Sequence, residues 1–316
     1  MLYNEDLKHI VGEEPLDVIS LLNPTPKDLG EVMVKCSQAD LLIFRANGKL
    51  PLTIIQEFAS AGLLDQFTQL SCPKVFWSQD SHHAHAEEVR GQNYFDRYYI
   101  AHANYLDRFD KNRTCYLPCC YGASSLDFLQ AINAEKFEKH FDIGSFYVQY
   151  PIGDRNIVMH NAKNIIAKRN LTFLFGKLYG SFRNFIDYVD MLRGIVTTDM
   201  ILNVSLIDDL NIRNFEAIAF NKKLIANELN DYKLINLDYS NTFFYKRDMS
   251  NFEDILVEAM ESESVKTWES VYSENCLIHR YVGIISYHRP RRWYGFSPLE
   301  GGLYRVALND YYPIGN

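Results

Sequence analysis

The sequence lacks several patterns that would each define a class of protein. It has no run of about 18 apolar residues, the length that a membrane-spanning helix needs. Its start, MLYNEDLKHIVGEEP, has no basic segment followed by an apolar one, as a secretory signal would. A formal net charge of −8 argues against a nucleic-acid scaffold, which normally carries a basic excess. These absences predict a cytoplasmic protein that does not bind nucleic acid, and they leave peripheral membrane contact open.

The cysteines show no spacing that is typical of a metal site or a redox pair. Cys119 and Cys120 are adjacent and form no C-x-x-C motif. We expect reduced, mostly buried thiols, as is usual in cytosolic proteins. The six positions are Cys36, Cys72, Cys115, Cys119, Cys120 and Cys276.

The chain has enough length and apolar content for one large domain or two medium ones. It contains 316 residues, of which 47% are hydrophobic and 23% charged. Strand-like apolar runs alternate with amphipathic helical patterns, which predicts an α/β fold with parallel sheets and helices on both faces. The expected strands are 16–22, 40–46, 73–80, 97–102, 114–120, 142–150, 171–176, 200–206, 223–226 and 241–246, and the expected helices are 26–39, 51–67, 155–168, 181–194, 213–220, 251–264 and 265–288.

The alternation occurs twice, which predicts two Rossmann-like domains. The polar segment around 124–142 is the expected boundary, giving domains of residues 1–135 and 136–288. The tail, 289–316, is expected to pack back on the first domain. In such folds ligands bind at the carboxyl ends of the strands, so we expect a cleft where the two sheets face each other.

The stretch IRNFEAIAF (212–220) places charged residues where a helix should enter the core. A helix N-terminus offers free N–H groups and a positive dipole end, which suit a phosphate. We expected Glu216 in the first turn of this helix. The alternative is structural: Asn211 caps the helix, Glu216 supports its first turn and Arg213 is solvated.

The surrounding segment, ILNVSLIDDLNIRNFEAIAFNKKLIA (201–226), resembles the sugar-nucleotide-binding half of GT-B glycosyltransferases, and most of all the spore-maturation (CgeB-type) glycosyltransferase-like family. The resemblance rests on Leu202-Asn203, on Arg213-Asn214-Phe215-Glu216 and on the strand ending at Ala226, with weaker matches over roughly residues 70–288. Where that family has Ala-Cys-Gly, this chain has Ala219-Phe220-Asn221. Asn221 must therefore take over the turn of the glycine, because Asn tolerates left-handed backbone angles better than most residues.

The resemblance implies a role for the charged residues of this helix. Glu216 would bind the ribose hydroxyls of a nucleotide and would face the cleft, and Arg213 would meet the donor diphosphate, which suits a guanidinium fork. Asn214 belongs to the same block. Asn203, at the end of a strand, is a further donor-binding candidate, although it could equally serve as a buried partner of the backbone.

Two more cations are candidates for neutralising the donor phosphates. Lys177 follows the expected strand 171–176, and Arg155 follows the turn at Gly153-Asp154. For each of them the alternative is a solvated loop residue.

The first domain offers a second candidate cluster in WSQDSHHAHAEE (77–88). Asp80 and His82 are expected at the carboxyl end of a parallel strand, where either could bind the acceptor or act as general base. The alternative is a helix cap followed by surface histidines. The spacing of the histidines matches a tetrahedral metal site poorly, so we predict no metal.

The sequence thus predicts a GT-B-like glycosyltransferase that moves a sugar from a nucleotide-diphosphate donor to a hydroxyl group. The acceptor would be a glycan, a lipid-linked molecule or a protein, and the nucleotide sugar is a co-substrate, so no cofactor is expected. One alternative is a GT-B-shaped nucleotide- or glycan-binding protein without turnover. Another is a different α/β enzyme, such as a nucleotide-sugar epimerase.

Overall fold

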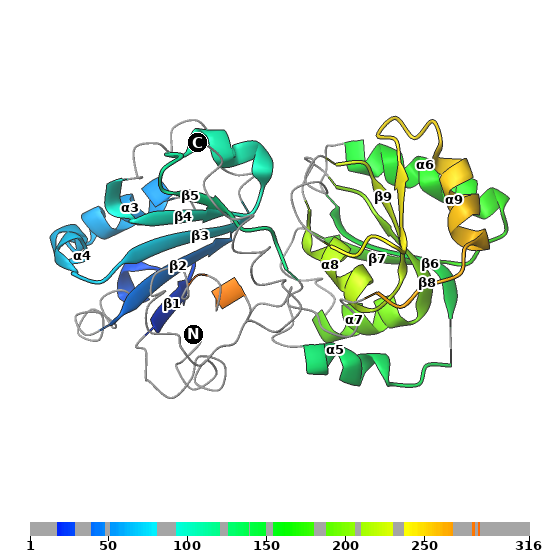
Figure 1. The fold of residues 1–316 in the computed structure, drawn as a ribbon, viewed down its shortest axis with the longest axis horizontal. Helices are drawn as coiled ribbons and strands as arrows, with labels where there is room; N and C mark the ends of the chain where they lie inside the picture. The colour runs from blue at the N-terminus through cyan, green and yellow to red at the C-terminus, as the bar shows by residue number, and fades with distance from the viewer. Residues whose placement is uncertain are drawn as a thin grey trace. The chain divides into compact units, whose positions relative to one another are not determined.

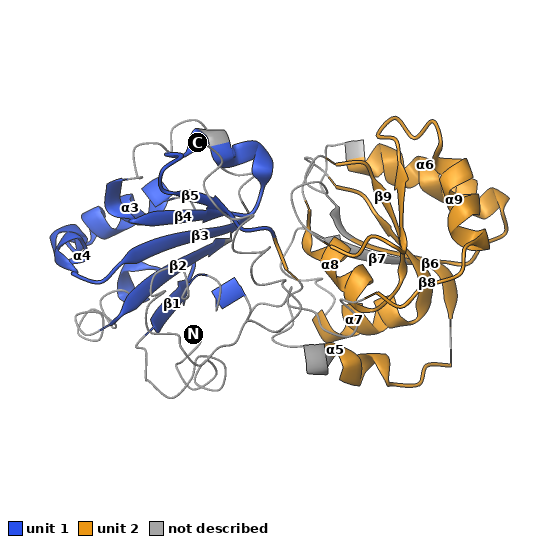
Figure 2. Cartoon of the chain, viewed as in Figure 1, with its two compact units in different colours: residues 1–118, 280–316 blue, residues 119–279 orange. Residues whose placement is uncertain are grey.

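The computed structural model describes residues 18–28, 39–47, 51–80, 93–120, 126–138, 140–149, 154–179, 188–205, 210–229, 237–267, 280–281 and 284. The chain divides into two units (Figure 2). Unit 1 comprises residues 1–118 and 280–316, and unit 2 comprises 119–279. The first unit therefore ends before position 135, and the chain returns to it before position 288.

Unit 1 contains a five-stranded parallel sheet in the order β1-β2-β3-β4-β5. The strands lie side by side in the order in which they occur in the sequence, so every crossover connection runs in the same direction across the sheet. The strands are β1 (Val18–Leu22), β2 (Leu41–Asn47), β3 (Lys74–Asp80), β4 (Arg97–Ile100) and β5 (Thr114–Tyr116), with helices α3 (Pro51–Ser60), α4 (Leu64–Gln69) and η3 (Ala103–Arg108).

One face of this sheet carries an aromatic core. Phe44 of β2 contacts Phe58 of α3 and Phe67 of α4, with ring centroids 6.2 and 5.5 Å apart. Burying rings of this size against one another is a main source of stability for the unit.

Tyr281 packs against other residues of the same sheet. Its hydroxyl lies 2.7 Å from Ser20 Oγ of β1, and its ring lies 5.2 Å from the ring of Trp77 of β3. This contact joins the returning C-terminal segment to unit 1. The tail 289–316 itself lies outside the described residues.

Unit 2 contains a second five-stranded parallel sheet, in the order β10-β9-β8-β6-β7 (Figure 1). The strand order changes direction between β6 and β8. Strand β7 lies on one side of β6, and β8, β9 and β10 follow one another on the other side. The strands are β6 (Phe141–Gln149), β7 (Phe173–Tyr179), β8 (Thr198–Asn203), β9 (Lys223–Asn227) and β10 (Thr242–Tyr245), with helices α5 (Leu126–Asn133), α6 (Asp154–Lys168), α7 (Tyr188–Val196), α8 (Ile212–Ala219) and α9 (Phe252–Glu261).

The core of unit 2 has two halves, one on each face of the sheet. Leu129 of α5, Leu192 of α7 and Phe215 of α8 belong to one cluster. Met159 of α6 and Leu256 of α9 belong to the other. Figure 1 shows the same three layers, with α6 and α9 opposite α7 and α8. The prediction of an α/β fold with two parallel sheets is therefore confirmed.

Some element boundaries differ from the sequence predictions. The expected helix 51–67 is two helices, because Gly62 adopts a left-handed φ of 71° between them. Helix α5 occupies part of the segment expected to be a polar boundary. Residues 265–267 are not helical, and 268–279 lie outside the described residues.

The described cysteines, Cys72, Cys115, Cys119 and Cys120, form no disulfide, and all but Cys119 are buried, as predicted. Among the residues that the structure describes, no helix combines the length and the apolar character that crossing a membrane requires.

Candidate functional site

The candidate site of unit 2 lies where β8 ends and α8 begins. Asn211 caps α8, and its side-chain oxygen accepts the Arg213 N–H at 3.0 Å. Since the helix begins at Ile212, Glu216 is in its second turn, and the first turn has no acidic residue. Glu216 is therefore the fifth residue of the helix, one residue further from the free N–H groups than expected.

Three asparagine side chains connect the strand to the helix. Asn203 Nδ2 donates to Asn214 Oδ1 at 2.9 Å and to Asn211 Oδ1 at 3.2 Å. Asn203 and Asn214 are buried, with 5% and 0% of their surface exposed. Buried amides that bond each other fix the register between β8 and α8. Their donor-binding roles stay predictions, and the structure gives each of them a positioning role.

Arg213 bridges α8 and the sheet. Its Nε donates to the carbonyl of Phe146 in β6 at 3.3 Å, and its Nη1 forms an ion pair with Glu216 Oε2. The side chain is 12% exposed. The alternative in which Arg213 is solvated is therefore wrong, because both of its contacts are internal.

Glu216 was expected to face a cleft, but its side chain is fully buried. It lies on the same side of α8 as Arg213, which precedes it by three residues and pairs with it. Burial raises the pKa of this carboxyl, and the Arg213 charge and the Tyr188 hydroxyl act in the opposite direction. Among the described residues, none forms a hydrogen bond of normal geometry with Glu216 Oε1. The site thus holds a buried carboxyl group with Oε2 paired to a cation, while Oε1 has no hydrogen bond of normal geometry within the described residues and the Tyr188 hydroxyl still acts on the group.

Two other cations, Arg155 and Lys177, are predicted to bind the donor, and the structure describes the side chain of Arg155 alone. Arg155, in the first turn of α6, donates its Nε to the carbonyl of Val204 at 2.9 Å. It therefore meets the chain directly after β8, one residue beyond Asn203. Lys177 lies inside β7, which continues to Tyr179, and not after the strand as expected. The structure does not describe the Lys177 side chain.

Asp80 is the last residue of β3 in unit 1, as the sequence predicts. The β2–β3 register shifts just before it, so that Ala46 pairs with Ser78 but Asn47 pairs with Asp80. Such bulges re-aim side chains and occur often beside functional sites. The Asp80 side chain is not described, and His82 lies outside the described residues.

Asn221 adopts a φ of 57°, so it takes the left-handed turn after α8, as predicted. Its Oδ1 also accepts the backbone N–H of Thr267 at 2.8 Å. The sequence analysis missed Tyr188 and the Phe146 carbonyl, which come from α7 and β6. No local motif marks either of them, since only the packing of the helices brings them to α8.

No family model and no curated protein matches the sequence. Solved structures do match. The chain is similar to an α,α-trehalose-phosphate synthase (UDP-forming) from Burkholderia vietnamiensis, with 9% identity, a TM-score of 0.52 and coverage of 84% of this chain and 80% of that one. It is also similar to the catalytic domain of starch synthase IV from Arabidopsis thaliana, solved with ADP and acarbose, with 8% identity, a TM-score of 0.46 and coverage of 84% and 76%.

At these identities the similarity shows the fold alone. With its two five-stranded parallel sheets, the chain has the GT-B glycosyltransferase fold.

Proposed function

We propose that the protein is a glycosyltransferase that moves a sugar from a nucleotide-diphosphate donor to a hydroxyl acceptor. The observation that carries the proposal is the buried carboxyl group of Glu216, whose Oε2 pairs with Arg213 and whose Oε1 has no hydrogen bond of normal geometry among the described residues. A buried acceptor whose hydrogen bonds are incomplete costs free energy, and the hydroxyl pair of a ribose would complete them. The resemblance to the CgeB-type family assigns the same role to this residue.

Arg213 controls access to that carboxylate. Its guanidinium pairs with Glu216, and it is the more exposed partner of the pair. A diphosphate offers a guanidinium a second bidentate partner. We expect Arg213 to turn toward the donor diphosphate, so that Glu216 becomes available to the ribose.

The remaining candidates would serve the leaving diphosphate and the acceptor. Arg155 and Lys177, together with the N-terminus of α8, would neutralise the negative charge that develops as the glycosidic bond breaks. Asp80 or His82 of unit 1 would hold the acceptor hydroxyl or remove its proton. The acceptor would be a glycan, a lipid-linked molecule or a protein.

The first test is a thermal-shift screen with nucleoside diphosphates and nucleotide sugars, beginning with uridine and adenosine compounds. A ligand that binds only the native state stabilises it by RT ln(1 + [L]/Kd). Calorimetry with the best ligand should then show weaker binding by Glu216→Gln. Glu253→Gln is the matched control, because Glu253 also pairs with an arginine in unit 2, at 2.7 Å from Arg169, but on exposed helices.

Turnover separates the candidate functions. Release of nucleoside diphosphate from a bound nucleotide sugar supports transfer, and binding without release would favour a binding protein of the same shape. Conversion of the bound sugar without release would favour an epimerase. If no nucleotide or nucleotide sugar shifts the melting temperature, the proposal fails.

A further inference from the structure

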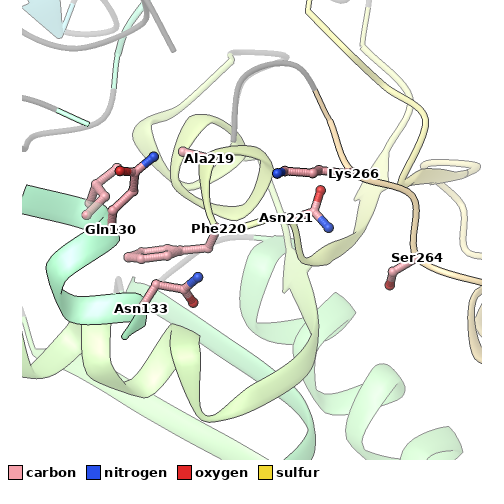
Figure 3. Close-up of a pocket in the computed structure, with 8 residues that line it drawn as sticks. Gln130, Asn133, Ala219, Phe220, Asn221, Ser264 and Lys266 are labelled. Carbon is pink, nitrogen blue, oxygen red and sulfur yellow. The ribbon is translucent and has the colours of Figure 1, made fainter. Parts of the chain in front are cut away.

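Unit 2 contains a pocket of about 450 Å³ at the C-terminal end of α8 (Figure 3). Its walls come from α5, from the end of α8 and from the segment that follows α9. At 1.5 Å per residue, α8 is about 12 Å long, so the pocket is at the opposite end of this helix from Arg213. The lining residues are Leu129, Gln130, Asn133, Ala219, Phe220, Asn221, Ser264 and Lys266.

The floor of the pocket is apolar and belongs to the core of unit 2. Leu129, Ala219 and Phe220 are buried members of the core cluster between α5, α7 and α8. The N–H of Phe220 bonds the carbonyl of Glu216 at 3.0 Å, and the Phe220 ring points toward α5 (Figure 3). An aromatic ring at the base of a polar pocket offers an apolar surface to the C–H face of a sugar ring.

The rim of the pocket carries polar side chains that are exposed to solvent. Within the described part of the chain, the side chains of Gln130, Asn133, Ser264 and Lys266 form no hydrogen bond. Among the described lining residues, none is a carboxylate and Lys266 is the single charged one. Hydrogen-bond donors therefore outnumber acceptors around the pocket, and its formal charge is positive.

We propose that this pocket binds a small hydroxylated anion, a sugar that carries one phosphate or carboxylate group. The amides of Gln130 and Asn133 can donate to and accept from hydroxyl groups, and the ammonium group of Lys266 pairs with the anionic substituent. The volume lies within the range of about 300–1,000 Å³ that ligand pockets occupy. Inorganic phosphate would leave the amides and the floor unused, and a neutral sugar would leave Lys266 unpaired.

The pocket is separate from the proposed donor site, so a test of the pocket does not depend on the proposed function. Calorimetry on the full chain with glucose 6-phosphate, glucuronate, glucose and inorganic phosphate tests it. One or both of the sugar anions should bind, at least about tenfold more tightly than glucose or phosphate, because loss of a charged hydrogen bond has about this effect. The two sugar anions distinguish a phosphate ester from a carboxylate as the natural group.

Three variants locate the binding. Lys266→Gln removes the cation, and Asn133→Asp places a negative charge in the pocket, so each should weaken binding of the sugar anion at least about tenfold. Lys168→Gln is the matched control, because Lys168 is exposed at the end of α6, outside the pocket. This variant should bind the sugar anion as tightly as the wild type does. Melting temperatures of the variants check that each is folded.

Each possible result either supports or overturns the proposed binding of a sugar anion. Absence of binding by both sugar anions at millimolar concentration overturns the proposal, and so does inorganic phosphate that binds as tightly as they do. Binding that survives in Lys266→Gln and in Asn133→Asp overturns it as well. Glu216→Gln should leave the affinity unchanged, and a loss there would assign the ligand to the donor site instead.

Discussion

Asn203 at the end of β8 donates its Nδ2 to Asn214 Oδ1 in α8 at 2.9 Å, and both side chains are buried. The bond holds the start of α8 against the strand that precedes it. Every donor-binding candidate on α8 therefore depends on it for position. Replacing one partner leaves the other buried amide without this bond, which is the costly case for a hydrogen bond.

We predict that Asn214→Leu, which keeps the branching of the side chain but removes its polar atoms, lowers the free energy of unfolding by at least about 1–3 kcal/mol. Urea denaturation measures the change. Asn203→Leu should cost a similar amount, and the double variant should lose less than the sum of the two. Strict additivity would show that the bond between the two side chains contributes nothing of its own.

The burial of Glu216 predicts a pH dependence of stability. Because burial raises the pKa of the carboxyl in the folded state above its usual value of 4.5, the folded chain binds this proton more tightly than the unfolded chain does. The contribution of Glu216 to the free energy of unfolding is thus greatest at low pH. It falls as pH rises from about the unfolded pKa through the folded one, by at most about 1.4 kcal/mol per pH unit.

Glu216→Gln removes the ionisable carboxyl group. The variant should therefore become more stable relative to the wild type as pH rises from about 4.5. Urea denaturation of both proteins at several pH values measures the difference, in which the contributions of other groups cancel. A difference between Glu216→Gln and wild type that stays constant with pH would contradict the raised pKa.

Gly194 in α7 leaves room for the ring of Phe146. A Cβ at this position would lie 2.7 and 2.8 Å from Cζ and Cε1 of that ring. Overpacking of a buried ring costs about 1–3 kcal/mol, which outweighs the gain in helix propensity of about 1 kcal/mol. We predict that Gly194→Ala is destabilised in urea, and that adding Phe146→Leu recovers part of the loss. Full stability of the single variant would show that the ring moves freely.

Asn221 allows a direct measurement of backbone strain. At its φ of 57° an alanine is strained and a glycine is not, while both lose the side-chain bond to Thr267. Asn221→Ala should therefore be less stable than Asn221→Gly by about 1 kcal/mol. Thermal denaturation of the pair measures the difference, and equal stabilities would mean that the turn relaxes in the variants.

The strands and most helices could be predicted from the sequence because apolar periodicity and buried runs are local signals. Helix α5 was missed because the sequence around it is polar, although Leu129 and Ile132 of this helix belong to the core. The break at Gly62 was missed because the helical pattern continues across it, and only the left-handed φ ends α3.

The neighbours of the α8 site could be predicted only in part. Strand ends and helix starts converge at one edge of a parallel sheet, which explains why Asn203 bonds Asn214 and why Arg155 bonds the Val204 carbonyl. The burial of Glu216 did carry a signal, since Glu216 precedes the buried Ala219 by three residues and so shares its face. Tyr188 carried none, because its approach to α8 depends on how α7 packs on the sheet.

Asp80 permits the sharpest test of transfer chemistry. It ends β3 at a shift of register, where it pairs with Asn47. If Asp80 is the general base, Asp80→Asn should keep donor affinity and lower the rate of sugar transfer by about 10²–10⁴-fold, the usual contribution of a positioned proton acceptor. If Asp80 only caps the following segment, asparagine caps nearly as well and the rate should barely change.

The assay is sugar transfer at saturating donor, with donor affinity measured in parallel by calorimetry. Asp65→Asn, an exposed aspartate in the first turn of α4 of the same unit, is the matched control and should transfer at the wild-type rate. A rate that falls only in Asp80→Asn, with unchanged donor affinity, assigns the defect to the acceptor step, because donor binding belongs to unit 2 in the proposal. An unchanged rate in Asp80→Asn would leave Asp80 a structural role, and His82 would become the candidate for the base.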